Sequence, residues 1–417
     1  MPAATGVGRV AFRSLASGAS WTLVASIAAA MSQWLLLMVT AKLGSAEMVG
    51  QLALSLAIVA PIQALTDLAL RPALATDARR DFRFRDYLQL RGIMIVLFIA
   101  VVGAAALLQG GAASPIVIAI GLQKAVESAS DLLFGLFQRE ERLKWMGQSV
   151  VLRSALSSIA FVGVMLAYGD LLVACLSGLV VRVGVLLLHD FGRGSALVLL
   201  DAGRGECRTF ELLKASLPLA MGLFLMSFAV NIPRYFVEKR MGVAALGVFA
   251  ALIYVFQAGA MLVDAVSQAA CVRLARSHML GDQRAFQALL TKLAGMAALA
   301  AGCGVLVAAA GGGPLLQLAY SAAFAGQAKP FLWLSVCALP WYCSSVLGYA
   351  LVARRQMTAL FYCQVASLAS TLAGSYWLIG ESGLTDACRV VFLTYSVLLA
   401  LYAIVLWRVP NEEGNLR

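Results

Sequence analysis

The sequence predicts an all-α integral membrane protein with twelve transmembrane helices, arranged as two pseudo-symmetric six-helix bundles. Hydrophobic residues make up 61% of the 417 residues and charged residues only 13%, whereas an average soluble domain has about 25% charged residues. The mean hydropathy is +0.87. The apolar residues are gathered into segments of about 20, the length of a helix that crosses a bilayer. The chain also matches itself at an offset of 197 positions, which predicts two related halves.

The internal repeat pairs residues 216–276 with residues 19–79 without a gap. Each copy has a long apolar segment, a short charged turn, a second apolar segment with a late Asp, and an Arg-bearing loop. Such duplication is typical of transporters that hold a substrate between two related bundles. We therefore predict bundles over residues 1–190 and 215–417, joined by a cytoplasmic linker over 191–214. The matched pairs are Lys42 with Lys239, Gly50 with Gly247, Ala53 with Ala250, Asp67 with Asp264, and Arg79 with Arg276.

The apolar run from Trp21 to Val39 is longer than the core of a cleavable signal sequence, so we interpret it as the first span. The turns between spans are mostly short, and no outer segment is long enough to form a domain. The run from Gly311 to Pro314 is expected to end the ninth span. The twelve predicted spans are 19–40, 48–70, 92–108, 115–137, 147–168, 171–189, 215–237, 243–263, 293–313, 330–352, 357–379 and 390–407.

The positive charges are distributed unevenly over the loops. With a cytoplasmic N-terminus, 23 of the 32 Lys and Arg fall in inner segments and only five in outer turns. Because positive residues accumulate in cytoplasmic loops, both termini are predicted to be cytoplasmic. The net charge of +11 is spread over these loops, which does not indicate nucleic-acid binding. Eight Cys without a CxxC pair and two distant His predict neither a disulfide framework nor a metal site.

Four basic residues fall inside predicted spans: Lys124, Arg153, Arg182 and Arg234. Each costs about 2.5–3.5 kcal/mol at the middle of a membrane helix, so we expect them to face a bundle interior or a wet cavity. The alternative for Arg182 is an ion pair with a carboxylate of a neighbouring span. Polar residues share a helix face with several of these cations, and the alternative for the Ser and Gln is hydrogen bonding between helices. The stripes are Lys124, Glu127, Asp131; Ser149, Arg153, Ser157; Ser227, Asn231, Arg234; Tyr254, Gln257, Asp264; and Gln364, Ser367, Thr371, Ser375.

The acidic residues inside the spans allow two interpretations. Glu127 and Asp131 either neutralise Lys124 or titrate in an ion-coupled transport cycle. Asp67 and Asp264 lie near the inner ends of the repeated helices, and Arg71 follows Asp67 by four positions. This spacing predicts a local ion pair between Asp67 and Arg71. Proline inside four spans, at positions 61, 218, 233 and 340, predicts bent helices.

Two runs of the sequence resemble a known family. Asn231-Ile-Pro-Arg-Tyr235 with Ala245–Ala250, and Lys42–Ala53 in the first half, are similar to the Wzx-type polysaccharide flippases. The superfamily of these proteins also contains the MATE exporters and the MurJ lipid II flippases. The resemblance covers essentially the whole chain and implies a MATE-like fold. Pro233 departs from the family, which often has an acidic residue before the Arg.

The resemblance implies a multi-pass protein of the bacterial inner membrane that flips undecaprenyl-pyrophosphate-linked oligosaccharide by alternating access. The partners are then this lipid-linked substrate and membrane lipids, with a polysaccharide polymerase and a chain-length regulator as further candidates. Arg binds a diphosphate bidentately and Lys binds it as a point charge. We predict substrate-binding residues Lys124, Arg153, Arg182, Arg234 and Asn231. For coupling to a proton or sodium gradient we predict Glu127, Asp131, Asp67 and Asp264.

Other functions stay open at this point. A MATE-like antiporter of drugs or organic cations is expected to carry acids and aromatics in its cavity, and here cations match or outnumber the deep acids. A membrane glycan polymerase or ligase needs a substantial outer loop with catalytic groups, and every outer turn is short. A scaffold without transport activity is a third alternative. No Walker motif is present, so we expect no ATP hydrolysis by this chain. For a transporter of this kind we expect no catalytic residues and no cofactor other than a coupled proton or sodium ion.

Overall fold

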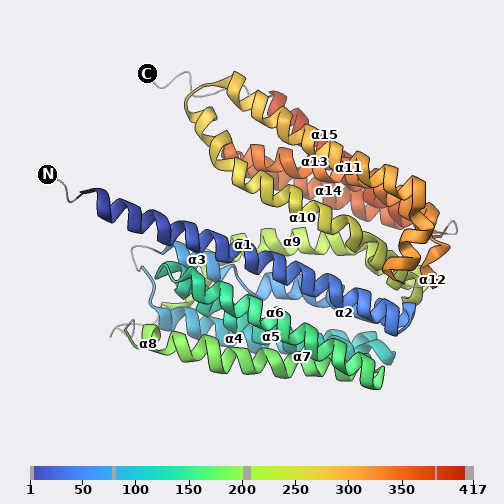
Figure 1. Cartoon of the computed structure of the whole chain (residues 1–417), viewed down its shortest axis with the longest axis horizontal. Coiled ribbons are helices and arrows are strands. Elements are labelled where there is room, and N and C mark those ends of the chain that lie inside the picture. Colours follow the sequence, from blue (N-terminus) through green and yellow to red (C-terminus); the bar gives the residue numbers. More distant parts are fainter. Residues whose placement is uncertain (1–3, 78–80, 201–207, 321, 381–382, 409–417) are drawn as a thin grey trace. The chain divides into compact units, whose positions relative to one another are not determined.

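The computed structural model describes residues 4–77, 81–200, 208–320, 322–380 and 383–408, with side chains at most positions from Trp21 onward. All regular elements in these ranges are helices (Figure 1). Two earlier predictions fall partly outside them, namely Arg79 of the repeat and residues 201–207 of the linker. The chain forms two compact units, Met1–Ser227 and Phe228–Arg417, and each is described by itself.

The first unit contains helices that pack side by side, with α6 lying between α1 and α7 in the packing order and α5 contacting α2, α3, α4 and α7. Its elements are α1 (Ala4–Leu43), α2 (Ala46–Thr66), α3 (Leu70–Thr76), α4 (Phe84–Gln109), η1 (Gly111–Ala113), α5 (Ser114–Arg139), α6 (Leu143–Tyr168), α7 (Leu171–Val185), the π-helix η2 (Leu186–Phe191), α8 (Gly192–Leu200) and the first part of α9 (Thr209–Met241).

The second unit is built around α13, which packs against α10, α11 and α15. Its elements are the remainder of α9, α10 (Val243–Met279), α11 (Gln283–Ala319), α12 (Ala322–Ala325), α13 (Ala328–Ala353), α14 (Met357–Leu378) and α15 (Leu384–Arg408).

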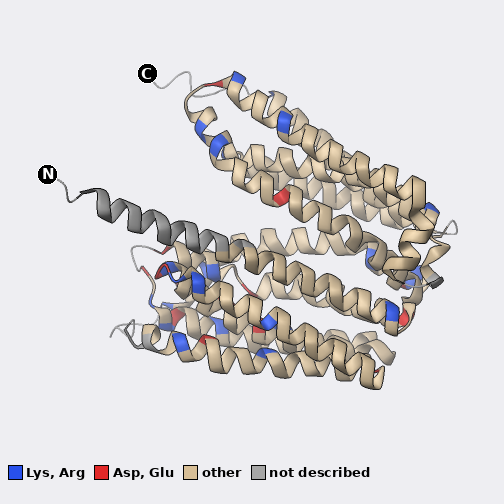
Figure 2. Cartoon of the chain, in the orientation of Figure 1, with Lys and Arg blue, Asp and Glu red and all other residues tan. Residues whose placement is uncertain are grey.

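Each predicted span coincides with a long helix. Within the described ranges, eleven helical segments are long and apolar enough to cross a membrane. The remaining one, α5, has 26 residues like its neighbours but carries Lys124, Glu127 and Asp131 within its apolar sequence. Most other charges gather near helix ends (Figure 2), and many large apolar side chains on the outer faces are exposed. The prediction of an all-α, multi-pass membrane protein is confirmed.

The internal repeat is visible in the helix boundaries. α2 begins at Ala46 and α10 at Val243, which are 197 positions apart. Gly50 and Gly247 are both buried near the start of these helices. The two copies then diverge after the paired Asp. α2 ends at Thr66, and the next residues, Leu68 and Ala69, have positive φ angles of 50° and 49°. In contrast, α10 continues without a break to Met279.

The division between the units falls inside α9, between residues 227 and 228. The sequence analysis instead predicts this division in the linker over residues 191–214. The first part of the predicted linker is helical, because α8 continues α7 through the π-helix η2. The start of α9 belongs to the first unit, since Leu212 and Ala220 are buried in the same core cluster as residues of α4 and α5.

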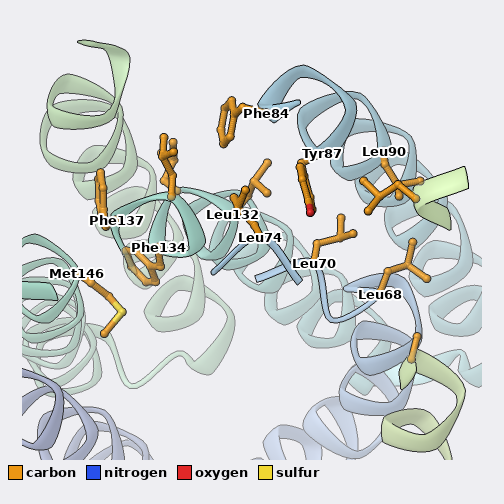
Figure 3. Close-up of a cluster of buried hydrophobic side chains, with 14 residues drawn as sticks. Leu68, Leu70, Leu74, Phe84, Tyr87, Leu90, Leu132, Phe134, Phe137 and Met146 are labelled. Carbon is orange, nitrogen blue, oxygen red and sulfur yellow. The ribbon is translucent and has the colours of Figure 1, made fainter. Parts of the chain in front are cut away.

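The core of the first unit lies where α3, α4, α5 and α6 meet (Figure 3). Its aromatic side chains Phe84, Tyr87, Phe134 and Phe137 are almost fully buried. Gly135 allows α3 to pack closely on α5, because an added Cβ would lie 3.1 Å from the backbone oxygen of Arg71. This approach brings Arg71 next to the charged face of α5.

The glycine-rich run of the ninth span bends its helix instead of ending it. α11 runs from Gln283 to Ala319 across a kink at Gly311, which has φ −155° and ψ 31°. Pro314 follows within the next turn. Proline removes one backbone hydrogen bond and clashes with the preceding turn, so a kink rather than a straight helix is the physical result. Leu316 and Tyr320 beyond the kink are buried again, which keeps the segment in the unit.

Candidate functional site

A polar cavity of about 310 Å³ lies inside the first unit. This volume is at the lower end of the range of about 300–1,000 Å³ for ligand pockets, so it suits one small ligand or one headgroup. The lining comes from α1, α2, α3, α5 and α6, with Asp67 between α2 and α3. The lining residues are Thr22, Ala25, Ser26, Ala29, Gln63, Asp67, Arg71, Glu127, Asp131, Phe134, Met146, Val150 and Arg153.

Glu127 on the cavity wall holds two of the predicted cations. The Nζ atom of Lys124 lies 2.7 Å from Glu127 Oε2, and the Nε atom of Arg182 lies 3.1 Å from Glu127 Oε1. Lys124 and Glu127 meet because positions three apart share one face of α5. Arg182 reaches across from α7, and its Nη1 also donates to Ser157 Oγ at 3.2 Å. The alternative that paired Arg182 with a carboxylate of a neighbouring span is confirmed.

Asp131 and Asp67 hold two arginines that the sequence places in inner segments. Arg71 Nη1 donates to Asp131 Oδ1 at 3.0 Å. Arg91 Nη1 donates to Asp67 Oδ1 at 2.6 Å and to Ser128 Oγ at 2.6 Å, and Ser128 Oγ in turn bonds Asp67. Arg91 is only 2% exposed. A buried guanidinium of this kind needs a compensating carboxylate, and Asp67 provides it.

The predicted ion pair between Asp67 and Arg71 is wrong. A spacing of four brings side chains together only if the helix is continuous. Here α2 ends before Asp67, and the left-handed residues Leu68 and Ala69 turn Arg71 away. Asp67 therefore meets Arg91 of α4, and Arg71 meets Asp131 of α5. Asp131 does not pair with Lys124, whose carboxylate partner is Glu127.

Arg153 projects from α6 into the same cavity. Its guanidinium carbon lies 5.8 Å from the centroid of the Phe134 ring, and that of Arg71 lies 5.9 Å from the same centroid. Aromatic faces attract such cations at these distances. Arg153 Nη1 is buried and has no hydrogen-bond acceptor among the described residues. Arg91 Nε and Nη2 are also buried without an acceptor in this part of the chain, but Arg91 does not line the cavity; of the two lining cations, Arg71 and Arg153, it is Arg153 that has an unused buried donor.

The cations outnumber the acids in this network. Five cations and three carboxylates line the cavity or pair with a residue that does, an excess of two positive charges. The excess lies within a membrane-spanning unit, where uncompensated charge is costly unless water or a ligand reaches it. The arrangement is suited to an anion. The cations are Arg71, Arg91, Lys124, Arg153 and Arg182, and the carboxylates are Asp67, Glu127 and Asp131.

The remaining predicted site residues lie in the second unit. Arg234 is 6% exposed, donates from Nη1 to Asn231 Oδ1 at 2.9 Å, and lies 5.7 Å from the centroid of the Tyr254 ring. Its Nε has no acceptor among the described residues. Asp264 accepts a hydrogen bond from Ser345 Oγ of α13. These residues come from α9, α10 and α13 of the second unit.

The polar stripe of the eleventh span serves helix packing. Thr371 Oγ1 lies 2.8 Å from Thr394 Oγ1, and Gln364 Nε2 donates to Tyr402 Oη at 2.9 Å. Both bonds join α14 to α15. The stripe thus follows the alternative of hydrogen bonding between helices, which Ser, Thr and Gln commonly form in membranes.

Arg71 and Arg91 are site residues that sequence reasoning missed. The predicted third span begins at residue 92, but α4 begins at Phe84, so Arg91 lies two turns inside the helix. Arg91 could have been found from its position directly before an unbroken apolar run, because an Arg so close to a membrane span is as unusual as one within it. Arg71 directly follows the predicted second span and gave no comparable signal.

Comparison with known proteins agrees with this architecture. No protein-family model matches the chain. A capsular polysaccharide biosynthesis protein, CapF of Staphylococcus aureus, is 24% identical over 392 residues, which cover 92% of this chain and 97% of the relative. An inward-facing multidrug resistance MATE family transporter of the MOP superfamily superposes with a TM-score of 0.73 at 12% identity, over 91% of this chain and 93% of that one.

The lipid II flippase MurJ, in an inward closed conformation, superposes with a TM-score of 0.69 at 10% identity, over 93% of this chain and 88% of that one. The predicted MATE-like fold is therefore confirmed. The chain shares its fold with this MATE transporter and with MurJ, and the resemblance found in the sequence agrees with the similarity to a capsular polysaccharide biosynthesis protein.

Proposed function

We propose that this protein is a flippase that moves an undecaprenyl-pyrophosphate-linked oligosaccharide across the bacterial inner membrane by alternating access. The observation that carries the proposal is the excess of positive charge around the cavity of the first unit. A diphosphate headgroup carries several negative charges and many acceptor oxygens, which guanidinium and ammonium groups bind strongly. The capsular polysaccharide relative supports a glycan as the rest of the substrate.

Arg153 is assigned the first contact with the headgroup, because its buried Nη1 has an unused donor beside the cavity. Lys124 and Arg182 are bound to Glu127, which lines the same cavity. Arg234 and Asn231 present a further guanidinium and amide in the second unit. The cavity has the volume of one headgroup, so the glycan and the lipid chain lie outside it.

Transport of organic cations is disfavoured by the same charge balance. Each cavity carboxylate already has at least one cation within 3.1 Å. A cationic drug therefore has to displace an arginine or lysine from its carboxylate and then remain next to it, which is electrostatically unfavourable.

Substitution of Arg153 tests the proposal with little effect on folding, because no described acceptor depends on its Nη1. Arg153→Gln is expected to lower surface glycan at least about tenfold, the loss of one charge-assisted contact. Lipid-linked oligosaccharide then accumulates in the cytoplasmic leaflet. Arg153→Lys keeps the charge and retains partial export. Arg142→Gln, whose guanidinium stacks on Trp145 away from the cavity lining, serves as the matched control. Normal export by a well-expressed Arg153→Gln protein contradicts the assignment.

A further inference from the structure

Glu127 differs from the other two cavity carboxylates because one of its paired cations has no further hydrogen-bond acceptor among the described residues. Arg71, on Asp131, also donates to Gln138 Oε1 at 3.2 Å and to Met146 Sδ at 3.3 Å. Arg91, on Asp67, also donates to Ser128. Lys124, on Glu127, has no other acceptor among the described residues. Glu127 therefore neutralises a cation that nothing else in the described protein holds.

Two of the cations near Glu127 are loosely held. Lys124 is bound only through Glu127 Oε2, and Arg153 has an unused Nη1 and lines the same cavity as Glu127. The side chain of Lys124 is also 31% exposed. Arg182, by contrast, is fixed by Ser157 and by the backbone oxygen of Gly178 in addition to Glu127. A ligand that competes for cations at this site can thus take Lys124 and Arg153 and leave Arg182 on Glu127.

We propose that Glu127 is an internal competitor of the anionic substrate: it neutralises Lys124 before the headgroup binds, yields it to the headgroup, and recaptures it on release. This inference rests on the proposed function, since it requires a phosphate-bearing substrate in the cavity. The exchange costs little in either direction because Lys124 always has an anion beside it in a low-dielectric region. A tightly bound diphosphate would otherwise leave slowly, and a carrier must release its substrate to complete a cycle.

The charge of Glu127 also acts directly on the ligand. A carboxylate on the wall of the same small cavity repels a diphosphate and lowers its affinity. Glu127 is therefore a residue that sets the affinity and release rate, while Arg153 and Lys124 make the contacts. Removing the charge of Glu127 is therefore expected to raise the affinity for the ligand, whereas removing a binding residue lowers it.

The test uses the full-length protein in lipid nanodiscs and farnesyl pyrophosphate as the probe. Isothermal titration calorimetry gives its Kd for the wild type, Glu127→Gln, Arg153→Gln and the control Glu140→Gln. Glu140 is the carboxylate beyond the end of α5 that pairs with Arg139 at 3.3 Å. Farnesol, which lacks the phosphates, reports binding of the chain alone. Thermal unfolding of each variant checks that it is folded.

Glu127→Gln is expected to bind farnesyl pyrophosphate about tenfold more tightly, which corresponds to 1.4 kcal/mol, and to show slower export with a lower KM. A merely structural role predicts weaker binding, since misfolding does not raise affinity. Glu140→Gln is expected to match the wild type.

Two outcomes separate this inference from the proposed function. If Arg153→Gln weakens binding but a folded Glu127→Gln binds equally or less tightly, the competitor role is overturned and the anion site stands. If no protein, including Glu127→Gln, binds farnesyl pyrophosphate better than farnesol, both the anion site and the competitor role are overturned. If Glu127→Gln does not fold, Lys124→Met and the charge-neutral double variant Lys124→Met with Glu127→Gln give the second measurement. The double variant is expected to bind farnesyl pyrophosphate more tightly than Lys124→Met, and equal or weaker binding overturns the competitor role.

Discussion

Ser345 of α13 donates its hydroxyl hydrogen to the carboxylate of Asp264 in α10. The same kind of bond joins Ser128 of α5 to Asp67 at the end of α2. α2 and α10 are the second spans of the two halves, and α5 and α13 are the fourth spans. The duplicated halves thus share one hydrogen bond between equivalent helices, as well as the repeat in sequence.

The two copies differ in the charge beside the Asp. Arg91 neutralises Asp67, while no Lys or Arg among the described residues lies within ion-pair distance of Asp264. Asp264 is in the middle of a continuous helix of 37 residues. A carboxyl that no cation holds can take up and release a proton without leaving a buried cation uncompensated. Among the four predicted coupling acids, Asp264 is therefore the best candidate.

Asp264→Asn is expected to remove the dependence of transport on an ion gradient. The amide still accepts the hydrogen bond from Ser345 but cannot titrate. The measurement is flipping of lipid-linked oligosaccharide in proteoliposomes with and without a proton gradient, and then with a sodium gradient. Asp264→Glu retains a titrating group and is expected to keep the dependence. An unchanged gradient response of Asp264→Asn removes this residue from the coupling mechanism.

Asp67→Asn is expected to destabilise the protein, because Arg91 then remains buried with only Asp131 at 4.0 Å to compensate it. Removing one partner of a buried ion pair typically costs about 3–5 kcal/mol. The second substitution Arg91→Met removes the stranded charge and is expected to restore much of the loss. Thermal unfolding of the purified variants in detergent measures both effects, with Glu47→Gln at an exposed helix start as control. A double variant as unstable as Asp67→Asn contradicts the explanation.

The architecture could be predicted from the sequence for a simple physical reason. A membrane leaves few solutions for the backbone other than a helix of sufficient length, so the apolar segments marked the helices. The pairing of Lys124 with Glu127 was equally accessible, because both lie on one helix and their spacing fixes their contact.

The contacts of Asp67 could not be predicted in this way. They depend on a helix break at Leu68 and Ala69, two residues that favour helices and rarely adopt positive φ. The break is imposed by packing of α3 on α5 and by the pairing of Arg71 with Asp131, and neither partner is close in sequence. The division at residue 227 was missed for a similar reason, because burial of the start of α9 in the first core leaves no local trace.

Gly259→Ala is expected to weaken the packing of α10 on α13. An added Cβ collides with the hydroxyl of Tyr342 and lies 3.0 Å from its Cζ. The Tyr342 hydroxyl is not free to move, since it donates to the backbone oxygen of Phe256 at 2.7 Å. Overpacking of this kind costs about 1–3 kcal/mol. The control Gly302→Ala, at an exposed helical position with no atom within 4 Å of the new Cβ, is expected to be neutral or up to about 1 kcal/mol more stable.

The clash at Gly259 can be checked by a double variant. Tyr342→Phe removes the colliding hydroxyl and by itself costs about 1 kcal/mol through its lost hydrogen bond. The combination with Gly259→Ala is expected to cost less than the two single losses added together. Additive losses show that the two positions do not interact.

Asp86→Ala is expected to loosen the start of α9 from the first unit. The buried carboxylate of Asp86 accepts from the backbone N–H of Arg83, at the start of α4, and from that of Arg208, which directly precedes α9, each at 3.1 Å. One side chain therefore caps two helices. Asp282 caps only α11, by accepting from Ala285 N–H at 2.9 Å.

Loss of one N-cap costs about 1 kcal/mol, so Asp86→Ala should lose about twice the stability of Asp282→Ala, because two sets of helix-end N–H groups lose their acceptor. Limited proteolysis at Arg208 gives the local readout, and it is expected to accelerate in Asp86→Ala only. Equal cleavage in both variants shows that the Asp86 carboxylate does not hold the start of α9 in place.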